Sequence, residues 1–348
     1  MTQNANNLED AALGCFLGAL VGDAAGATLE FLGKQPTLPN VEQAMTMPGG
    51  GVWNVAPGQI TDDGELMLSL AQALAQSQQF NLEVIAQSYV QWVESKPFDI
   101  GLTTSSALGC FRMPTWKTVC DEQGYAAGMT QAAEQLCMMS KANGSLMRIA
   151  PLGIWGHRLE DEQLAILAGQ ESRLSHPNES CCQAVACYVL AIASLMRTSS
   201  DTDSDLDLDS GRLNQRSLAF ERAKNWAADR ANKEVRSWLQ DAEDNVDIPY
   251  QPHVGFIKIA FTHAFRHLLH GSDYVTAIQE TLYGGGDTDT NACIVGGLIG
   301  AACGAAAIPD TMKSPVLNCN THQGNHPRPE FLQTTQVRAL VQNLLDNC

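Results

Sequence analysis

The stretch LGCFLGALVGDAAG, residues 13–26, places a glycine at every fourth position: Gly14, Gly18, Gly22 and Gly26. Positions four apart lie on one face of a helix, so these glycines form a stripe without side chains. The stretch CIVGGLIGAACG, residues 293–304, repeats the spacing with Gly296, Gly300 and Gly304. Each glycine costs a helix about 1 kcal/mol relative to alanine, and close approach of two helix backbones can offset that cost. We therefore expect these two helices to pack together at the buried centre and to join both ends of the chain in a single domain, residues 1–348.

The rest of the periodic sequence is also helical in character. Apolar residues recur at three- and four-residue spacing in four further segments, residues 82–93, 181–196, 255–269 and 337–345. The alternation of apolar and polar residues that is typical of strands is hard to find. The sequence therefore predicts an all-α fold, a compact bundle of helices.

One acidic segment departs from this pattern. RTSSDTDSDLDLDSGR, residues 197–212, is rich in serine and nearly free of large apolar side chains. A calcium loop of the EF-hand type is one reading, but the segment lacks the glycine and the distal glutamate of that motif. We interpret it as a solvated, mobile loop, followed by a surface helix at about residues 216–242.

The overall charge bounds the classes of partner. The chain carries 38 acidic and 21 basic side chains, for a formal net charge of -17. Such a chain repels nucleic-acid backbones and anionic membranes, so we expect neither as a partner. The apolar stretch at residues 292–308 is short and rich in Gly and Ala, which indicates a buried core helix rather than a membrane span.

Cysteine usage and the first residues bear on the compartment. The eleven cysteines include no CxxC pair, which favours reduced, mostly buried thiols over a disulfide framework or a zinc site. MTQNANNLED, residues 1–10, lacks the basic start and apolar core of a secretion signal. We therefore expect a cytoplasmic protein.

Two short motifs carry the candidate chemistry, and each stands where a helix is expected to begin. ITDDGELMLSL (60–70) supplies a hydroxyl and two carboxylates, and YGGGDTDTN (283–291) supplies a matching set. Asp and Thr also cap helices, which is the simplest reading of either motif alone. Together the motifs offer six oxygen donors, enough for two divalent cations: Thr61, Asp62, Asp63, Asp287, Asp289 and Thr290. Such ligands favour Mg²⁺, Mn²⁺ or Ca²⁺ over zinc, and bound cations would relieve the repulsion between the carboxylates.

Three histidines form a second metal candidate. His263, His267 and His270 have a spacing that would suit a metal ion on one helix face. On a helical wheel they lie roughly opposite the apolar residues of the same segment, Phe261, Ala264, Phe265 and Leu268. We therefore interpret the histidines as a solvated face rather than a metal site.

Six sequence elements resemble the ADP-ribosylglycohydrolase family in order and rough spacing: GDAAGATLEF (22–31), TDDGELM (61–67), FDIGLTTSSAL (98–108), NGSLMRIAPLG (143–153), SHPNES (175–180) and GGDTDTNACIVGGLIGA (285–301). The resemblance covers about residues 8–310 apart from the acidic segment. It implies an all-α orthogonal bundle with a dinuclear Mg²⁺ or Mn²⁺ centre held by the six oxygen donors. It further implies catalytic roles for Asp62, Asp63 and Glu30, which matches a family glutamate on a mobile loop beside the metals. Many relatives have Thr or Ser where this chain has Gly64.

The resemblance also implies where the substrate binds. NGSLMR reads as a turn into a helix, and the backbone N–H groups around Asn143, Gly144 and Ser145 are expected to hold the phosphates of ADP-ribose. His176 is expected to line the adenosine pocket, although a polar helix cap is the alternative. Phe256 is expected to stack on adenine, although it could equally belong to the core. We also expect substrate contacts from Gly285 and Gly286.

These implications lead to a functional expectation. The chain is expected to be a metal-dependent hydrolase that removes ADP-ribose from modified protein side chains, with arginine as the preferred linkage. The expected partner is an ADP-ribosylated protein, with an ADP-ribosylating enzyme or toxin as a further candidate. The alternatives are a binding or toxin-masking immunity protein of the same fold, a hydrolase of serine- or acetyl-linked ADP-ribose, and a two-metal phosphohydrolase.

Overall fold

The computed structural model describes residues 2–200 and 208–347, and across these ranges helices make up the fold. Within them the only β features are two isolated bridges, Gly50 with Val55 and Ala142 with Phe256. The predicted all-α fold is therefore confirmed. The helices are α1 (Thr2–Gly26), α2 (Leu38–Ala44), α3 (Asp62–Leu74), α4 (Leu82–Glu94), α5 (Leu102–Leu108), α6 (Pro114–Gln123), α7 (Tyr125–Leu136), α8 (Ala150–Trp155), α9 (Asp161–Arg173), α10 (Glu179–Ser200), α11 (Leu208–Arg230), α12 (Lys233–Glu243), α13 (Ile257–Leu269), α14 (Tyr274–Gly284), α15 (Thr288–Cys303), α16 (Asp310–Leu317) and α17 (Val337–Asp346).

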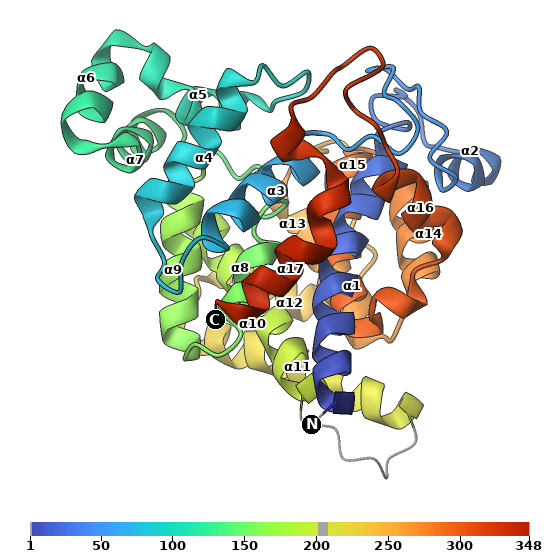
Figure 1. Cartoon of the computed structure of the whole chain (residues 1–348). Coiled ribbons are helices and arrows are strands. Elements are labelled where there is room, and N and C mark those ends of the chain that lie inside the picture. The colour runs from blue at the N-terminus through green and yellow to red at the C-terminus, as the bar shows by residue number, and fades with distance from the viewer. Residues whose placement is uncertain (1, 201–207, 348) are drawn as a thin grey trace.

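The two glycine-striped helices, α1 and α15, pack side by side at the centre of the molecule (Figure 1). A β-carbon added to Gly18 would lie 2.2 Å from the carbonyl oxygen of Gly296, and one added to Gly300 would lie 2.1 Å from that of Gly14. These distances are far below any real contact, so only glycine permits the approach. The prediction that the start and the end of the chain meet is confirmed, while the single domain stays a prediction.

Helix α10 is a long apolar helix of the core. Its Glu179–Ser199 stretch is long and apolar enough to cross a membrane by length and composition, but 94% of that stretch is buried inside the molecule. Helices α1, α8, α9 and α11 cover it. Helix α15 is likewise buried along its length, as expected for residues 292–308. All ten cysteines that the structure describes are buried and unpaired, in agreement with the sequence analysis.

The acidic segment is shorter as a loop than expected. Helix α10 continues to Ser200 and α11 begins at Leu208, so both ends of the 197–212 segment are helical. The hydroxyls of Thr198 and Ser199 donate back to the carbonyls of Ser194 and Leu195, which satisfies these polar residues within the helix. Residues 201–207, where the rest of the predicted loop falls, lie outside the described residues.

The prediction of one surface helix at about residues 216–242 was wrong in two respects. The chain forms two helices there, α11 and α12, and Asn232 caps the second by accepting from the amide of Val235 at 3.1 Å. Phe220 and Trp238 are buried against neighbouring helices. Apolar residues on one side of each helix therefore belong to the core, while Leu218 remains exposed.

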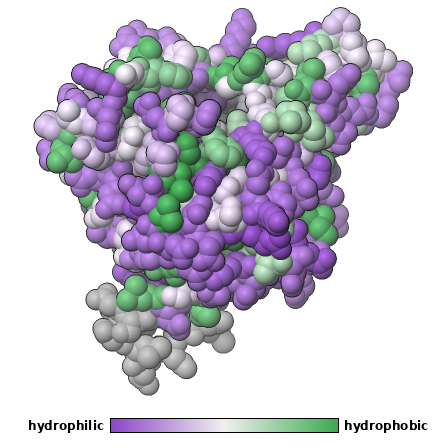
Figure 2. Space-filling model, turned by 180° about the vertical axis from the view of Figure 1, so that it is seen from behind, coloured by the Kyte–Doolittle hydropathy of each residue, from purple (hydrophilic) through white to green (hydrophobic). Residues whose placement is uncertain are grey.

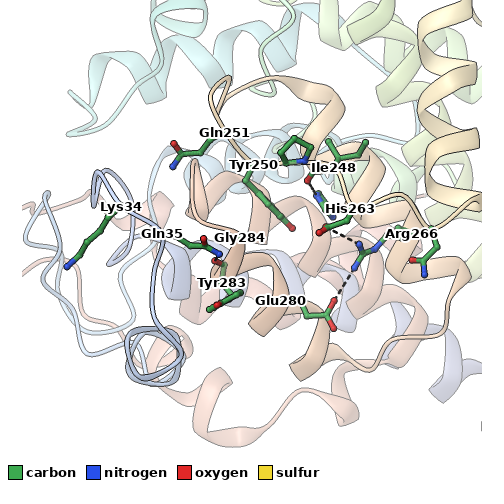
Figure 3. A pocket seen from close by; sticks show the side chains of 13 residues that line it. Lys34, Gln35, Ile248, Tyr250, Gln251, His263, Arg266, Glu280, Tyr283 and Gly284 are labelled. Atoms are coloured by element: carbon green, nitrogen blue, oxygen red, sulfur yellow. Dashed lines mark hydrogen bonds and ion pairs between the residues drawn. The ribbon is translucent and has the colours of Figure 1, made fainter.

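The interpretation of the histidines as a solvated face is wrong for two of the three. His263 and His267 of α13 are buried, because the loop before α13 and helix α14 cover this face (Figure 3). His263 Nε2 bonds the Ile248 carbonyl at 2.8 Å, and the ring stacks on Tyr250. Burial lowers the pKa of His263 to about 4 and that of His267 to about 3, so both rings are neutral.

The pocket of Figure 3, about 790 Å³ in volume, opens beside these buried rings. It lies between α13, α14 and the loop before α13, and Arg266 spans it to contact Glu280 at 3.1 Å. The Tyr250 ring at its wall packs on Gly284, where an added β-carbon would lie 2.2 Å from the ring. The pocket therefore borders the glycine turn that leads into Asp287. The reverse face of the molecule is mostly hydrophilic, with separate small hydrophobic areas (Figure 2).

Candidate metal centre

The two acidic motifs meet at the C-terminal end of α1. Helix α3 begins at Asp62 and α15 begins at Thr288, and the central packing of α1 brings both starts together. Thr61 Oγ1 lies 3.1 Å from Asp63 Oδ2 and 3.4 Å from Asp289 Oδ2. The Thr290 amide donates to Asp289 Oδ1 at 2.9 Å. The structure thus places the two predicted halves of the oxygen set in contact, although they are more than 220 residues apart in sequence.

The simple capping interpretation fails at both helix starts. Thr61 and Asp287 occupy the N-cap positions of α3 and α15, but neither side chain makes a capping hydrogen bond. Asp23 of α1 caps α3 instead, accepting from the amides of Thr61 and Gly64 at 3.0 and 2.8 Å. Gly64 leaves room for this carboxylate, because an added β-carbon would lie 2.7 Å from Asp23 Oδ2. Neither side chain caps its own helix: Thr61 Oγ1 donates to Asp23 Oδ1 at 2.8 Å, and Asp287 Oδ2 accepts from the side chain of Asn143 at 2.7 Å.

The tightest acidic group combines a predicted catalytic residue with two predicted metal ligands. One carboxylate oxygen each of Glu30, Asp287 and Asp289 lie within 4.8 Å of one another. Burial, and then the nearby Glu30 carboxylate, raise the pKa of Asp289. The indole of Trp53 donates to Glu30 Oε2 at 2.8 Å, and the side-chain amide of Asn143 donates to Asp287 Oδ2 at 2.7 Å. Two neutral side chains thus orient this triad.

Seven carboxyl groups share this region, which we call the carboxylate centre: Asp23, Glu30, Asp62, Asp63, Asp99, Asp287 and Asp289. Burial raises the pKa of every one of them, and neighbouring carboxylates raise most of them further. The pKa of Glu30 rises to about 8, that of Asp23 to about 7 and that of Asp99 to about 6. The pKa values of Asp62, Asp63 and Asp289 lie well above the usual range.

The chemistry of this donor set fits a divalent cation. Among the described residues, no ion pair joins any of the seven carboxyl groups to lysine or arginine. Asp63 Oδ1 is buried and has no hydrogen-bond partner. Buried carboxylates are ordinarily paired or bound to a metal, and hard oxygen ligands suit Mg²⁺, Mn²⁺ or Ca²⁺.

Two members of the centre were missed by the sequence analysis, although both lie in quoted motifs. Asp23 is the one charged residue in an otherwise apolar stretch of α1, which was a usable signal. Asp99, in FDIGLTTSSAL, is half-buried beside an aromatic cluster in which Phe98 stacks on His326 at 4.4 Å. Trp53 contacts the same Phe98 ring edge-on. The C-terminal segment that carries His326 therefore reaches the rim of the centre. No local sequence pattern predicted this contact.

A buried turn borders the centre on the other side. The segment 141–143 pairs with 255–257 through backbone hydrogen bonds. The backbone amide of Asn143 donates to the Gly255 carbonyl at 3.1 Å, and that of Ile257 donates to the Lys141 carbonyl at 2.9 Å. NGSLMR forms successive turns rather than the helix start that was expected, because α8 begins only at Ala150.

At the start of this turn two adjacent backbone donors are unused. The Asn143 carbonyl accepts from the amides of Leu146 and Met147, at 2.8 and 3.1 Å. The amides of Gly144 and Ser145 have no partner among the described residues, although both residues are buried. Buried backbone N–H groups without a partner are rare, and adjacent ones form an anion-binding concavity. We call residues 143–145 the cradle.

The remaining predicted substrate residues surround these two features. The His176 ring packs under the cradle, where a β-carbon on Gly144 would lie 2.8 Å from its Cε1. Burial, then Arg148, lowers the pKa of His176 to about 3, so the ring is neutral. Phe256 is half-buried and meets the edge of Trp238 at 5.6 Å, which leaves both readings of this ring open. Gly285 and Gly286, both at positive φ, form the turn that presents Asp287.

Comparisons with known proteins agree with this architecture. A sequence model of the family described as ADP-ribosylglycohydrolase matches residues 4–347. The ADP-ribosyl-[dinitrogen reductase] glycohydrolase of Rhodospirillum rubrum is 27% identical over 309 residues, which is 87% of this chain and 89% of that protein. The ADP-ribosylarginine hydrolase Tri1 of Pseudomonas putida (strain GB-1) is 30% identical over 187 residues, 51% of this chain and 45% of that protein.

A solved structure described as an ADP-ribosylglycohydrolase-related protein complex has the same fold. It superimposes with a TM-score of 0.71 at 23% identity and covers 98% of this chain and 99% of that one. The family match extends over nearly the whole chain, and the motifs that carry the earlier resemblance converge in space on the carboxylate centre. The chain therefore belongs to the ADP-ribosylglycohydrolase family.

Proposed function

We propose that this protein hydrolyses the N-glycosidic bond between ADP-ribose and an arginine side chain of a modified protein. The observation that carries the proposal is the carboxylate centre, seven buried or half-buried carboxyl groups that pair with no lysine or arginine of the described residues, beside a cradle with two unused backbone donors. The first feature favours cations and the second an anion. A substrate that joins a diphosphate to a ribose and a guanidinium satisfies both.

Two Mg²⁺ or Mn²⁺ ions would be held by the predicted oxygen set, Thr61, Asp62, Asp63, Asp287, Asp289 and Thr290. When bound, such ions lower the pKa of a coordinated water and stabilise charge that develops at the anomeric carbon. Asn143 fixes the orientation of Asp287 through its 2.7 Å hydrogen bond. Asp23 fixes the start of α3 and with it the position of Thr61.

Glu30 is the candidate for proton transfer. Its carboxyl lies against Asp287 and Asp289 and is oriented by the Trp53 indole. In the reaction the oxygen of water bonds to the ribose C1″, the bond from C1″ to the guanidine nitrogen breaks, and one proton moves from the water to that nitrogen. A positioned carboxyl group that takes and returns this proton is ordinary general acid–base catalysis.

The cradle would bind the diphosphate. The unpaired amides of Gly144 and Ser145 offer two adjacent N–H donors to phosphate oxygens. His176, neutral beneath them, would face the adenosine side, and Phe256 would offer its ring to adenine. Gly285 and Gly286 would allow the ribose to approach the backbone closely, since they carry no side chain.

Asp99 favours arginine as the linked residue. It lies outside the predicted metal set, yet its pKa rises to about 6 through burial and the nearby Asp287. A guanidinium in contact would restore its charged form, whereas the neutral oxygen of a serine or acetyl linkage would not. The relative from Pseudomonas putida is named an ADP-ribosylarginine hydrolase, which supports the same choice.

The setting follows from the substrate. The partner would be a cytoplasmic protein modified on arginine, either by an endogenous regulatory enzyme or by an ADP-ribosylating toxin. An immunity-type protein that masks such a toxin is the second candidate, because the same fold can bind without turnover. A binder alone would have no use for an oriented Glu30 inside an acidic triad.

The test is release of ADP-ribose from an arginine-ADP-ribosylated protein, followed with Mg²⁺, with Mn²⁺ and after EDTA. Serine-linked and acetyl-linked substrates run in parallel, with an Asp62→Ala/Asp289→Ala variant as the matched inactive control. Metal-dependent release from arginine alone supports the proposal. Release of AMP instead would establish a phosphohydrolase. Release of ADP-ribose from the serine-linked substrate alone would change the proposed linkage from arginine to serine. Binding of ADP-ribose without any release would favour the immunity-type binding protein.

A further inference from the structure

A buried polar cluster lies directly beneath the cradle and takes no part in the proposed chemistry. It consists of Arg148 from the turn, Glu171 from α9 and Tyr89 from α4, and the side chains of the ion pair are 0% exposed. Arg148 Nε donates to Glu171 Oε1 at 2.6 Å, and the Tyr89 hydroxyl donates to the same oxygen at 2.5 Å. The guanidinium carbon also lies 4.9 Å from the centre of the Tyr89 ring. Three segments that are distant in sequence are thereby joined.

One hydrogen bond from this cluster reaches the cradle. Arg148 Nη1 donates to the carbonyl oxygen of Gly144 at 3.1 Å. The C=O and N–H of one trans peptide unit point in opposite directions, so holding the Gly144 carbonyl toward Arg148 turns the Ser145 N–H away from it. The Asn143 carbonyl, held by the amides of Leu146 and Met147, orients the Gly144 N–H in the same manner.

The residue after Glu171 holds the opposite edge of the cradle. Ser172 Oγ lies 3.0 Å from Ser145 Oγ and 3.0 Å from the carbonyl oxygen of His176. His176 in turn packs its ring against Gly144. The C-terminal end of α9 therefore contacts the cradle through Arg148, Ser145 and His176.

The energetics point to a role beyond stability. A buried arginine–glutamate pair loses so much hydration that well-packed apolar residues often stabilise a fold equally well. Here Arg148 Nη2 and Glu171 Oε2 are buried without partners, so the pair is not even fully compensated. What an apolar residue could not supply is a fork that bonds Glu171 and the Gly144 carbonyl at the same time.

We propose that Arg148, fixed by Glu171 and Tyr89, is a positioning residue that holds the cradle in the shape required to bind a diphosphate. The proposal rests on the proposed function, which places the diphosphate of ADP-ribose at the cradle. Arg148 acts through the backbone of Gly144 and Ser145 and does not contact the substrate.

Calorimetric titration of the full-length protein with ADP-ribose, and separately with adenosine, tests this role. In Arg148→Met and Arg148→Lys we expect the Kd for ADP-ribose to rise about tenfold or more, and the Kd for adenosine to change less than about twofold. Lysine keeps the positive charge but not the fork, so similar losses in both variants indicate positioning. Wild-type affinity in Arg148→Lys, or equal weakening of both ligands, would overturn the proposal.

Two milder variants keep the test decisive if the Arg148 variants fail to fold. Tyr89→Phe removes one hydrogen bond to Glu171, and Ser172→Ala releases Ser145. Each should raise the Kd for ADP-ribose about threefold, and Tyr89→Phe should do so without affecting adenosine. An unchanged Kd for ADP-ribose in either folded variant contradicts the positioning role. If the wild-type protein does not bind ADP-ribose, the proposed function fails and this inference fails with it. If it binds and the variants bind equally well, only the positioning role is lost.

Discussion

Charge is buried in two contrasting ways in this molecule. At the carboxylate centre, acidic groups crowd together and no described lysine or arginine pairs with them. In two other places an arginine and a glutamate are buried in direct contact, Arg148 with Glu171 and Arg328 with Glu65. Since an unpaired buried carboxylate is costly, the first arrangement is unfavourable until a cation binds, while in the second the opposite charges partly offset each other. The difference separates groups that act on a ligand from groups that hold the backbone.

The Arg328–Glu65 pair shows the holding function most clearly. Arg328 donates to both oxygens of Glu65, at 2.7 and 2.9 Å, and to the carbonyl of Ser95 at 2.9 Å. Glu65 follows Asp63 by two residues in α3, and Ser95 lies four residues before Asp99. The C-terminal segment thus ties together two segments that carry acidic members of the centre.

The largest difference between the two regions should appear when one carboxylate of the centre is made neutral. In Asp289→Asn we expect kcat/KM with Mg²⁺ to fall about 10³-fold, roughly 4 kcal/mol, because a metal ligand is lost. The same change should raise the melting temperature of the metal-free protein, because it removes repulsion with Glu30, Asp63 and Asp287. Enzyme assays and calorimetry in EDTA measure the two effects. Unchanged activity would remove Asp289 from the metal set.

The equivalent change in a buried pair should have the opposite effect on stability. Glu171→Gln leaves the Arg148 guanidinium buried without its anion, and we expect the free energy of unfolding to fall by about 3 kcal/mol. Urea denaturation measures the loss. The control is Glu162→Gln, which removes an exposed partner of Arg230 and should change stability by less than about 0.5 kcal/mol. A stabilised Glu171→Gln would erase the contrast between the two regions.

The sequence predicted one side of this contrast better than the other. The glycine stripes and the two acidic motifs are local patterns, and they correctly predicted the α1–α15 contact and the meeting of Thr61 with Asp289. Asp23 and Asp99 were not predicted as members of the centre, because their roles depend on which helix end or loop the fold brings beside them. The buried ion pairs of Arg148 and Arg328 were not predicted for the same reason, since each arginine bonds a glutamate contributed by a separate helix.

The buried histidines of α13 show the complementary error. A helical wheel separates an apolar face from a polar one, but it cannot show a second layer of chain packed over the polar face. His263 is buried because Ile248 and Tyr250 lie against it, and no periodicity within α13 reports that loop.

The pH dependence of stability should also distinguish the two regions. The folded-state pKa values of Asp99, Asp23 and Glu30 are raised to about 6, 7 and 8. Between pH 4 and 8 the folded state therefore binds more protons than the unfolded state, so stability is full at the acidic end and is lost as pH rises. We expect the metal-free protein to lose at least about 2 kcal/mol between pH 5 and 8, as measured by denaturation in EDTA. Excess Mg²⁺ should reduce the slope, because cations bound beside these three carboxyl groups favour their charged forms, and a slope unchanged by Mg²⁺ would show that no cation binds near them.

The smallest expected effect concerns Asp99, which stands between the two categories. It belongs to the carboxylate centre by charge, but it is half-buried and lies outside the predicted metal set. If Asp99 pairs with the guanidinium of the substrate, Asp99→Asn should raise KM for an arginine-linked substrate about tenfold, roughly 1.4 kcal/mol, and leave metal affinity unchanged. The exposed Asp121→Asn serves as the control, since Asp121 pairs only with Lys117 on the surface of α6. If metal affinity falls in Asp99→Asn while KM holds, Asp99 acts as part of the cation site. In that case the proposed preference for arginine would have to come from the aromatic rim formed by Trp53, Phe98 and His326 rather than from charge.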